Sequence, residues 1–284
     1  MKLSKIFALL LALCLISSAA CAATFTDAHG NVIELDDSLE AYAAVTLVGA
    51  DNAARQGETN LGDLWADALR WFAVSGEINA AFDEDDVKAG NDRIAVDADH
   101  VVALWNGGNL RADIAEGTFG AEALAEVLPF PNKVAVVYMT GTQLLETLEA
   151  ASQGLPYTAE TADACASLMQ VSGLTYAVDT TKAYDALEAY GDHWFTAGSV
   201  SRVRIDDVNG QPFDAEATYA VVTSNANFNG MDSSYVLKAA AEANEQSAVT
   251  TAVVRDVVFR FIAAELNHQV GEAYAAPQGR LTIL

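Results

Sequence analysis

An apolar run that ends abruptly in two glycines constrains this chain more than any other stretch. Residues 101–105, Val-Val-Ala-Leu-Trp, are followed at once by Asn106, Gly107 and Gly108. Such a run predicts a strand buried inside a sheet. The glycines predict a turn whose backbone adopts angles closed to other residues, or which a ligand approaches closely. This stretch therefore predicts both a core strand and a candidate binding site at its end.

Arg111 follows this turn directly. Its guanidinium is planar and permanently charged, which suits a phosphate or a carboxylate. The chain has only 15 basic residues against 39 acidic ones, so a cation beside a glycine turn stands out. The alternative is an ordinary β-turn whose arginine lies on the surface or pairs with Asp113. The residues alone leave both interpretations open.

The overall charge narrows the class of partner. The 284 residues carry a formal net charge of −24, and 52% of them are hydrophobic, which is enough for a substantial core. Nucleic acids and anionic membrane surfaces are bound through basic patches, so this acidic chain argues against both as partners. A small anionic ligand remains compatible with the sequence where a few arginines converge.

The N-terminus is typical of an export signal. Residues 1–22 combine a basic start, an apolar stretch over residues 6–16, and the small-x-small sequence Ala20-Cys21-Ala22. We expect cleavage after Ala22 and a periplasmic or cell-envelope location. Lipidation of Cys21 is the alternative, and it would be the route by which this chain contacts a membrane.

Hydrophobic periodicity and capping residues predict one α+β domain, with a mixed sheet and flanking helices, over residues 45–284. An N-terminal extension over residues 23–44 precedes it. The Asn209-Gly210 turn predicts that the strands on either side of it pair as a hairpin. The expected strands are 45–48, 101–105, 133–139, 169–178, 202–208, 218–224 and 280–284, with a small hairpin at 24–35. The expected helices begin at Thr59 or Asn60, near Gly120, after Thr140 and near Val253. Residues 83–86 and 225–232 are expected loops, and residues 157–166 and 180–197 are expected to hold long loops with short helices.

Several sequence blocks together resemble the C-terminal domain of bacterial and animal 5′-nucleotidases and UDP-sugar hydrolases. They occur in that family's order and cover residues 45–284. The blocks are Arg55-x-x-Glu58-Thr59-Asn60-Leu61-Gly62-Asp63-Leu64, Asn106-Gly107-Gly108-x-Leu110-Arg111-Ala112-Asp113-Ile114, Val127-Leu128-Pro129-Phe130-x-Asn132, Thr140-Gly141-x-Gln143-Leu144-Leu145 and Gln170-Val171-Ser172-Gly173-Leu174.

The resemblance implies a substrate-recognition site for a nucleotide or nucleoside. In the family, arginines hold the ribose or phosphate and two aromatic rings sandwich the base, which is sound chemistry for nucleotide recognition. Phe130 falls on the first ring, Asn132 beside it, and Asp232 on the carboxylate that accepts from ribose hydroxyls. The remaining polar and turn positions fall on Arg55, Asn106, Gly107, Gly108 and Arg111.

The position of the second ring departs from the family pattern. Counting back from Asp232, it is occupied by Ala226, and the nearest aromatic residue is Phe228. Either Phe228 closes the sandwich or the clamp is one-sided. Loss of one stacking face would weaken binding by about 1–3 kcal/mol.

A second departure concerns catalysis. Family enzymes place a binuclear metallophosphatase domain before this one, and residues 23–44 are too few to form it. Asp27-Ala28-His29-Gly30 and Gly191-Asp192-His193 echo fragments of the metal-binding motifs, but the other motifs are missing. Ser172 lacks a nucleophile-elbow context, and Cys165 has no identifiable base. We therefore expect no catalytic residue, metal ligand or cofactor in this chain.

Three hypotheses about function follow. The first is an exported nucleotide- or nucleoside-recognition domain of nucleotide catabolism, non-catalytic alone, that completes a separate metallophosphatase protein. The second is a metal-dependent phosphohydrolase with a rebuilt site at His29 or His193. The third is a cell-envelope interaction module whose site has drifted, which the substitution at Ala226 favours. Nucleotide binding that depends on Arg111 would separate the first from the third.

Overall fold

The computed structural model describes residues 24–26, 32–34 and 40–284. The chain divides into two units, Met1–Ser38 and Leu39–Leu284. In the first, β1 (Thr24–Thr26) and β2 (Val32–Glu34) pair as antiparallel strands with Thr24 opposite Glu34, as the expected hairpin requires. The expected export signal, residues 1–22, lies outside the described residues.

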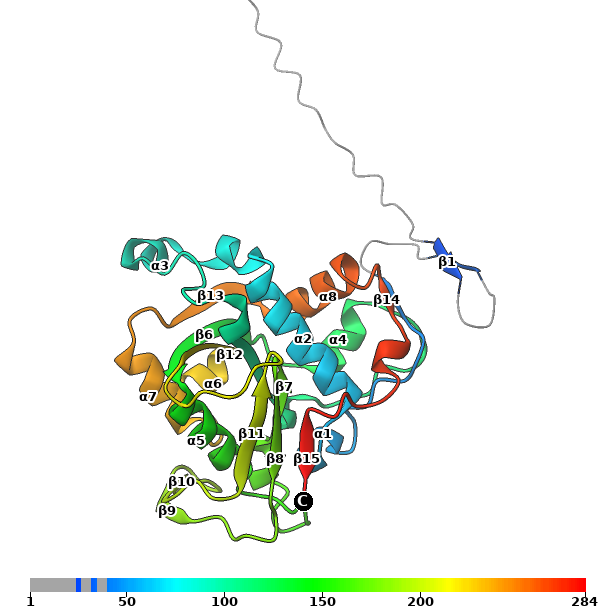
Figure 1. Cartoon of the computed structure of the whole chain (residues 1–284). Coiled ribbons are helices and arrows are strands. Elements are labelled where there is room, and N and C mark those ends of the chain that lie inside the picture. Colours follow the sequence, from blue (N-terminus) through cyan, green and yellow to red (C-terminus); the bar gives the residue numbers. More distant parts are fainter. Residues whose placement is uncertain (1–23, 27–31, 35–39) are drawn as a thin grey trace, which may run out of the picture. The chain divides into compact units, whose positions relative to one another are not determined.

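A five-stranded mixed sheet forms the centre of the second unit (Figure 1). The strands lie in the order β13 (Ala248–Val253), β6 (Lys133–Thr140), β12 (Thr218–Ser224), β4 (Val101–Asn106) and β7 (Met169–Ser172). Strand β12 runs parallel to β4 and antiparallel to β6, while β7 runs antiparallel to β4. Every residue of β4 is buried, which confirms the predicted core strand. The parallel and antiparallel pairings, together with the helices, confirm the predicted mixed sheet with flanking helices.

The alternation of side chains along β4 divides the core into two halves. Val101, Ala103 and Trp105 belong to one hydrophobic cluster, and Val102 and Leu104 belong to the other. Helices α2 (Asn60–Val74), α4 (Ala121–Val127) and α8 (Val254–Ala264) contribute to the first cluster, and α5 (Gly141–Ala151) and α7 (Tyr235–Ala243) to the second. Among the described residues, no helix is long and apolar enough to cross a lipid bilayer.

Shorter elements surround this sheet. Two three-stranded sheets have the orders β14-β3-β5 and β11-β8-β15, and β9 pairs with β10. Their bounds are β3 (Ala41–Ala43), β5 (Gly117–Phe119), β8 (Leu174–Val178), β9 (Ala186–Ala189), β10 (Phe195–Ala197), β11 (Val203–Val208), β14 (Gln269–Val270) and β15 (Leu281–Ile283). The remaining α-helices are α1 (Ala53–Gln56), α3 (Glu84–Ala89) and α6 (Asn225–Phe228), the last within an expected loop.

The helix-capping predictions are confirmed. The Thr59 hydroxyl accepts a hydrogen bond from the Gly62 N–H at the start of α2. Thr140 and Gln143 form the expected capping box at the start of α5. These side chains satisfy backbone donors that the first turn of a helix leaves without partners.

Two strand predictions were wrong. The expected strand 169–178 breaks at Gly173, whose φ of +79° starts a new strand, β8, in a different sheet. The hairpin expected around Asn209-Gly210 does not form, because β11 pairs with β8 whereas β12 pairs with β4 and β6. The burial pattern explains this: β12 is almost entirely buried and needs neighbours on both edges, whereas β11 alternates buried and exposed positions.

Two local predictions were also wrong. The expected acidic loop begins helix α3, because Asp83 and Asp86 form a reciprocal capping box. Their carboxylates satisfy N–H groups and suit the positive end of the helix dipole. The expected strand at 45–48 is reduced to an isolated bridge between Leu47 and Ile114.

Two carboxyl groups, the buried one of Asp63 and the half-buried one of Glu58, fix the C-terminal segment against the start of α2. Asp63 accepts a hydrogen bond from the Gln278 N–H at 3.0 Å, and Glu58 accepts one from the Leu281 N–H at 2.9 Å. The other carboxyl oxygens of Asp63 and Glu58 are buried without a hydrogen-bond partner among the described residues. Burial raises the pKa of Asp63 to about 8; nearby Glu58 raises it too, while Arg280 and the Gln278 N–H oppose the shift. A proton shared between the two carboxyl groups would satisfy both orphaned oxygens.

Candidate functional site

The glycine turn after β4 is built for close packing of the chain on itself. A Cβ added to Gly107 would lie 2.0 Å from the carbonyl oxygen of Ala54, in α1. One added to Gly108 would lie 2.7 Å from the Cβ of Ala166. Neither glycine is among the residues with positive φ. The expectation of unusual backbone angles was therefore wrong, and protein atoms make the close approach to Gly107.

Asn106 connects this turn to a distant loop. Its Nδ2 donates a hydrogen bond to Asp232 Oδ2 at 2.7 Å, and its Oδ1 accepts one from Asn109 Nδ2 at 2.7 Å. Asp232 has a φ of +55°, a left-handed conformation that aspartate tolerates better than most residues. Two independent constraints, backbone conformation and the Asn106 amide, thus hold the Asp232 carboxylate.

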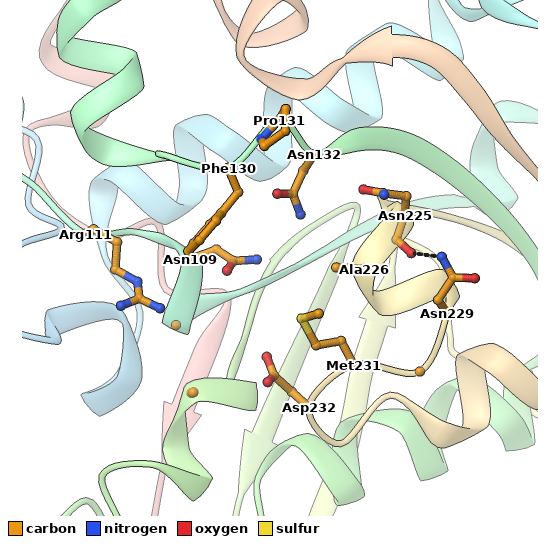
Figure 2. Close-up of a pocket in the computed structure, with 13 residues that line it drawn as sticks. Asn109, Arg111, Phe130, Pro131, Asn132, Asn225, Ala226, Asn229, Met231 and Asp232 are labelled. Carbon is orange, nitrogen blue, oxygen red and sulfur yellow. Dashed lines mark hydrogen bonds between the residues drawn. The ribbon is translucent and has the colours of Figure 1, made fainter. Parts of the chain in front are cut away.

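A cavity of about 580 Å³ opens between the β4 turn and this loop (Figure 2). This volume lies within the range typical of small-molecule sites. The cavity contains five of the residues predicted for the site, and the others that line it come mostly from an asparagine-rich stretch. The lining residues are Gly108, Asn109, Arg111, Phe130, Pro131, Asn132, Ala166, Asn225, Ala226, Asn229, Gly230, Met231 and Asp232.

Phe130 presents an aromatic ring at one wall of this cavity. The residue is 44% exposed, and the guanidinium carbon of Arg111 lies over the ring, 5.8 Å from its centroid. Figure 2 shows the ring nearly edge-on, with Arg111 on one side and Ala226 and Met231 across the cavity on the other. One face of the ring therefore contacts a cation, and the other faces the cavity.

The alternative pairing of Arg111 with Asp113 does not occur. Asp113 Oδ1 accepts hydrogen bonds from the N–H groups of Gly49 and Ala50, at 2.7 and 2.8 Å. The ion pairs of the described residues do not include Arg111. The cation at the glycine turn is thus available to an anionic ligand.

Arg55 lies at the same end of the site but is not among the residues that line the cavity. Its Nη1 donates to the carbonyl oxygen of Ala162 at 3.0 Å and lies 3.8 Å from Asp163 Oδ1. Burial lowers the pKa of Arg111, and the neighbouring charge of Arg55 lowers it further. The two arginines therefore produce a positive potential at this end of a strongly acidic protein.

The environment of Asp232 is balanced between burial and positive charge. Burial raises the pKa of its carboxyl group above the ordinary aspartate value, while Arg55, Arg111 and the Asn106 amide oppose the shift. The Asp232 carboxyl group thus lines the cavity and is held there by the Asn106 amide.

Asn132 contributes an amide to the cavity. The residue is buried, at 8% exposure, and its side chain points into the cavity in Figure 2. Its backbone carbonyl accepts the N–H of Val254, which fixes the residue beside the start of α8. The hydrogen bonds of the described residues do not include the Asn132 side chain, so both ends of its amide are available to a ligand.

Phe228 does not face Phe130 across the cavity. It packs against the hydrophobic cluster that contains Val236 and Leu237, and it is not among the residues that line the cavity. Residues two positions apart on a helix point in nearly opposite directions, so α6 presents Ala226 to the cavity and turns Phe228 away. Of the two arrangements considered for the clamp, the structure has the one with a single ring.

Sequence reasoning missed several lining residues, namely Asn109, Pro131, Ala166, Asn225, Asn229, Gly230 and Met231. A signal for some of them was present in the unusual stretch Asn225-Ala226-Asn227-Phe228-Asn229. Its asparagines stabilise the loop: Asn225 Oδ1 accepts from the Lys133 N–H at 2.9 Å, and Asn227 Nδ2 donates to Ser234 Oγ at 2.8 Å. No periodicity marks such roles, because loop asparagines act through individual contacts.

The other side chains that were considered for catalysis lie outside the cavity or outside the described residues. His193 Nε2 lies 3.8 Å from Asp163 Oδ2, and His29 lies outside the described residues. Ser172 donates its hydroxyl to Asp67 at 2.6 Å, and burial raises the pKa of the Cys165 thiol. Within the described part of the chain, no group of three or more His, Cys, Asp and Glu side chains could hold a metal ion.

Known proteins match this chain over most of its length. A trifunctional nucleotide phosphoesterase of Bacillus subtilis (strain 168) is 28% identical over 188 residues, which are 65% of this chain and 10% of that protein. The structure of a 5′-nucleotidase precursor from Thermus thermophilus is 29% identical with a TM-score of 0.61, covering 86% of this chain and 39% of that one.

A more distant structure, the NAD nucleotidase of Haemophilus influenzae, shares the fold with a TM-score of 0.57 at 14% identity. That match covers 92% of this chain and 48% of the Haemophilus protein, so the chain spans less than half the length of each of these relatives. The model of the 5′-nucleotidase C-terminal domain family matches residues 40–239. The chain therefore belongs to the 5′-nucleotidase C-terminal domain family.

Proposed function

We propose that this domain binds a nucleotide or nucleoside in the 580 Å³ cavity between the β4 turn (residues 106–108) and the α6 loop (residues 225–232). One observation carries the proposal: an exposed aromatic face, the guanidinium of Arg111 and an oriented carboxylate line one cavity, with the charge of Arg55 close behind Arg111. Each of the three groups suits one part of a nucleotide. The family membership of the chain supports the same substrate class.

The base would lie against the open face of Phe130, where stacking stabilises any heteroaromatic ring. The amide of Asn132, which can both donate and accept, lies at the same wall and can bind the edge of the base. Ribose hydroxyl groups would donate to Asp232, which the Asn106 amide holds in place at 2.7 Å. The phosphate would lie toward Arg111, with Arg55 adding positive potential behind it.

We further propose that the domain acts in nucleotide catabolism as a recognition unit. Metal-dependent phosphoryl chemistry would come from a metallophosphatase domain or a separate metallophosphatase protein. The much greater length of the relatives supports this division, since the matched domain is a tenth of the B. subtilis phosphoesterase and 39% of the T. thermophilus nucleotidase. The sequence of residues 1–22 supports export to the periplasm or cell envelope.

The experiment is calorimetric titration of AMP into the purified protein without added metal. We expect a dissociation constant between micromolar and low millimolar, equivalent to about 4–8 kcal/mol. Substitution Arg111→Ala should weaken AMP binding about 10-fold or more, because a charge-assisted contact contributes about 1.5–3 kcal/mol. Arg204→Ala is the matched control, since Arg204 is exposed on β11 and pairs with Asp206.

Two results would count against the proposal. Absence of binding for AMP and adenosine alike would remove the nucleotide site altogether. Equal loss of affinity in the Arg111 and Arg204 variants would show that AMP responds to overall charge rather than to this cavity.

A further inference from the structure

The side chain of Met231 is apolar but exposed at the cavity. It lines the cavity and is 58% exposed, whereas Met139 and Met169 are 2% and 0% exposed. When a ligand covers a long apolar side chain at the mouth of a cavity, removal of that surface from water stabilises the complex. Met231 therefore offers an apolar contact surface to whatever occupies the site.

The backbone around Met231 is fixed on both sides. The Met231 N–H donates to the carbonyl oxygen of Ala226 at 3.0 Å, and the Met231 carbonyl accepts the Ser234 N–H at 3.1 Å. The Tyr190 hydroxyl donates to the carbonyl oxygen of Gly230 at 2.7 Å, and Gly230 has a φ of +84°. The loop thus holds the base of the Met231 side chain while its thioether end stays free to adjust.

Met231 enters the cavity from the side opposite Phe130. Figure 2 shows its thioether directed from the α6 loop into the space that the open face of Phe130 also borders. Ala226 is too short to fill that space, and Phe228 packs into the core. We propose that Met231 forms the second wall of the base-binding site, so that a base lies between the Phe130 ring and the Met231 thioether.

This inference rests on the proposed nucleotide binding and adds a specificity-determining residue to it. Sulfur in a thioether is polarisable and makes favourable contacts with aromatic rings. Its three rotatable bonds let it follow the outline of either a purine or a pyrimidine. A Phe–Met pair should therefore hold a base less tightly than two rings, and should discriminate less sharply among bases.

The first test compares two ligands on three variants by calorimetry. AMP carries a base, and ribose 5-phosphate carries the same ribose and phosphate without one. Met231→Ala should weaken AMP binding about 2- to 10-fold and leave ribose 5-phosphate unchanged. Met231→Phe should bind AMP at least as tightly as the unsubstituted protein, and Met231→Leu should stay within about 2-fold of it, because it retains an apolar wall.

The second test uses the exposure of the sulfur. Dilute hydrogen peroxide should transfer one oxygen atom to the Met231 sulfur, giving the sulfoxide and water, while the buried Met139 and Met169 are protected. The oxidised protein should lose AMP affinity about as much as Met231→Ala does, and methionine sulfoxide reductase should restore it. Met231→Leu should resist this loss, which also controls for oxidation of Met1.

The outcomes separate the two proposals. If the unsubstituted protein binds AMP but Met231→Ala and the sulfoxide bind it equally well, nucleotide binding stands and the role of Met231 is refuted. If Met231→Ala weakens AMP and ribose 5-phosphate equally, Met231 does not act on the base, and the inference is again overturned. If the unsubstituted protein binds neither AMP nor adenosine, both proposals fail.

Discussion

Replacing Asp63 by asparagine should flatten the dependence of stability on pH. The Asp63 side chain is fully buried, and its pKa is raised from 3.8 to about 8, first by burial and then by nearby Glu58, against the opposing effect of Arg280. Between these two pH values the folded protein keeps a proton that the unfolded chain releases. The stabilisation that this proton gives is fully present below about pH 4 and is lost as the pH rises toward 8.

The magnitude follows from the conversion of about 1.4 kcal/mol per pKa unit. In the window between the two pKa values, Asp63 lowers the free energy of unfolding by up to about 1.4 kcal/mol for each unit of pH. From pH 5 to pH 7 the change is up to about 2.7 kcal/mol. Asparagine stays neutral, can still accept from the Gln278 N–H, and can donate to the orphaned Glu58 oxygen, so Asp63→Asn should lose this dependence.

Urea denaturation at pH 5, 6 and 7 measures the effect, with the fluorescence of buried Trp65 and Trp105 as the signal. Asp85→Asn is the matched control, because that carboxylate is 93% exposed on helix α3. We expect the control to follow the unsubstituted protein and Asp63→Asn to gain stability relative to both as pH rises. Parallel stability curves for all three proteins would refute a shared proton at Asp63.

Three further predictions concern the turn and the cavity. Gly107→Ala should lower the free energy of unfolding by about 1–3 kcal/mol or more in urea denaturation, because its Cβ would lie 2.0 Å from the Ala54 carbonyl oxygen. Gly57→Ala, whose Cβ would meet only Ile283 at 3.9 Å, should be nearly neutral. Equal effects of the two substitutions would contradict the packing role of Gly107. Adenosine affinity should fall in acid, because Asp232 takes up a proton and burial raises its pKa. The affinity of Asp232→Asn should depend less on pH. Identical pH profiles of the two proteins would exclude Asp232 as the titrating group. Asn132→Ala should weaken adenosine binding about 2- to 10-fold while sparing ribose 5-phosphate, whereas equal losses for both ligands would place the amide away from the base.

The sequence predicted those parts of the fold that depend on residues close together in the chain. The Thr59 and Thr140 side chains each accept from an N–H group three residues further along the chain, so the starts of both helices could be predicted directly from the sequence. The strand 101–105 was recognisable because every residue in it is apolar. The pairing of β12 with β4 and β6 was not, because it depends on contacts between segments far apart in the chain.

The candidate site likewise contains residues that the sequence located and residues that it did not. Arg111, Phe130, Asn132 and Asp232 could be located through motifs, and the structure brings them to one cavity. Phe228 could not be oriented from the sequence, because one turn of α6 determines whether its ring faces the cavity or the core. The position of Met231 depends on backbone hydrogen bonds to Ala226 and Ser234, which leave no trace in residue spacing.

The most direct measurement of the central claim is a crystal structure of the protein with AMP at saturating concentration. We predict electron density for the base against the open face of Phe130, ribose hydroxyl groups within hydrogen-bond distance of Asp232, and the phosphate toward Arg111. An empty cavity in crystals grown with AMP, or AMP bound at another place on the protein, would contradict the assignment of this cavity as a nucleotide site.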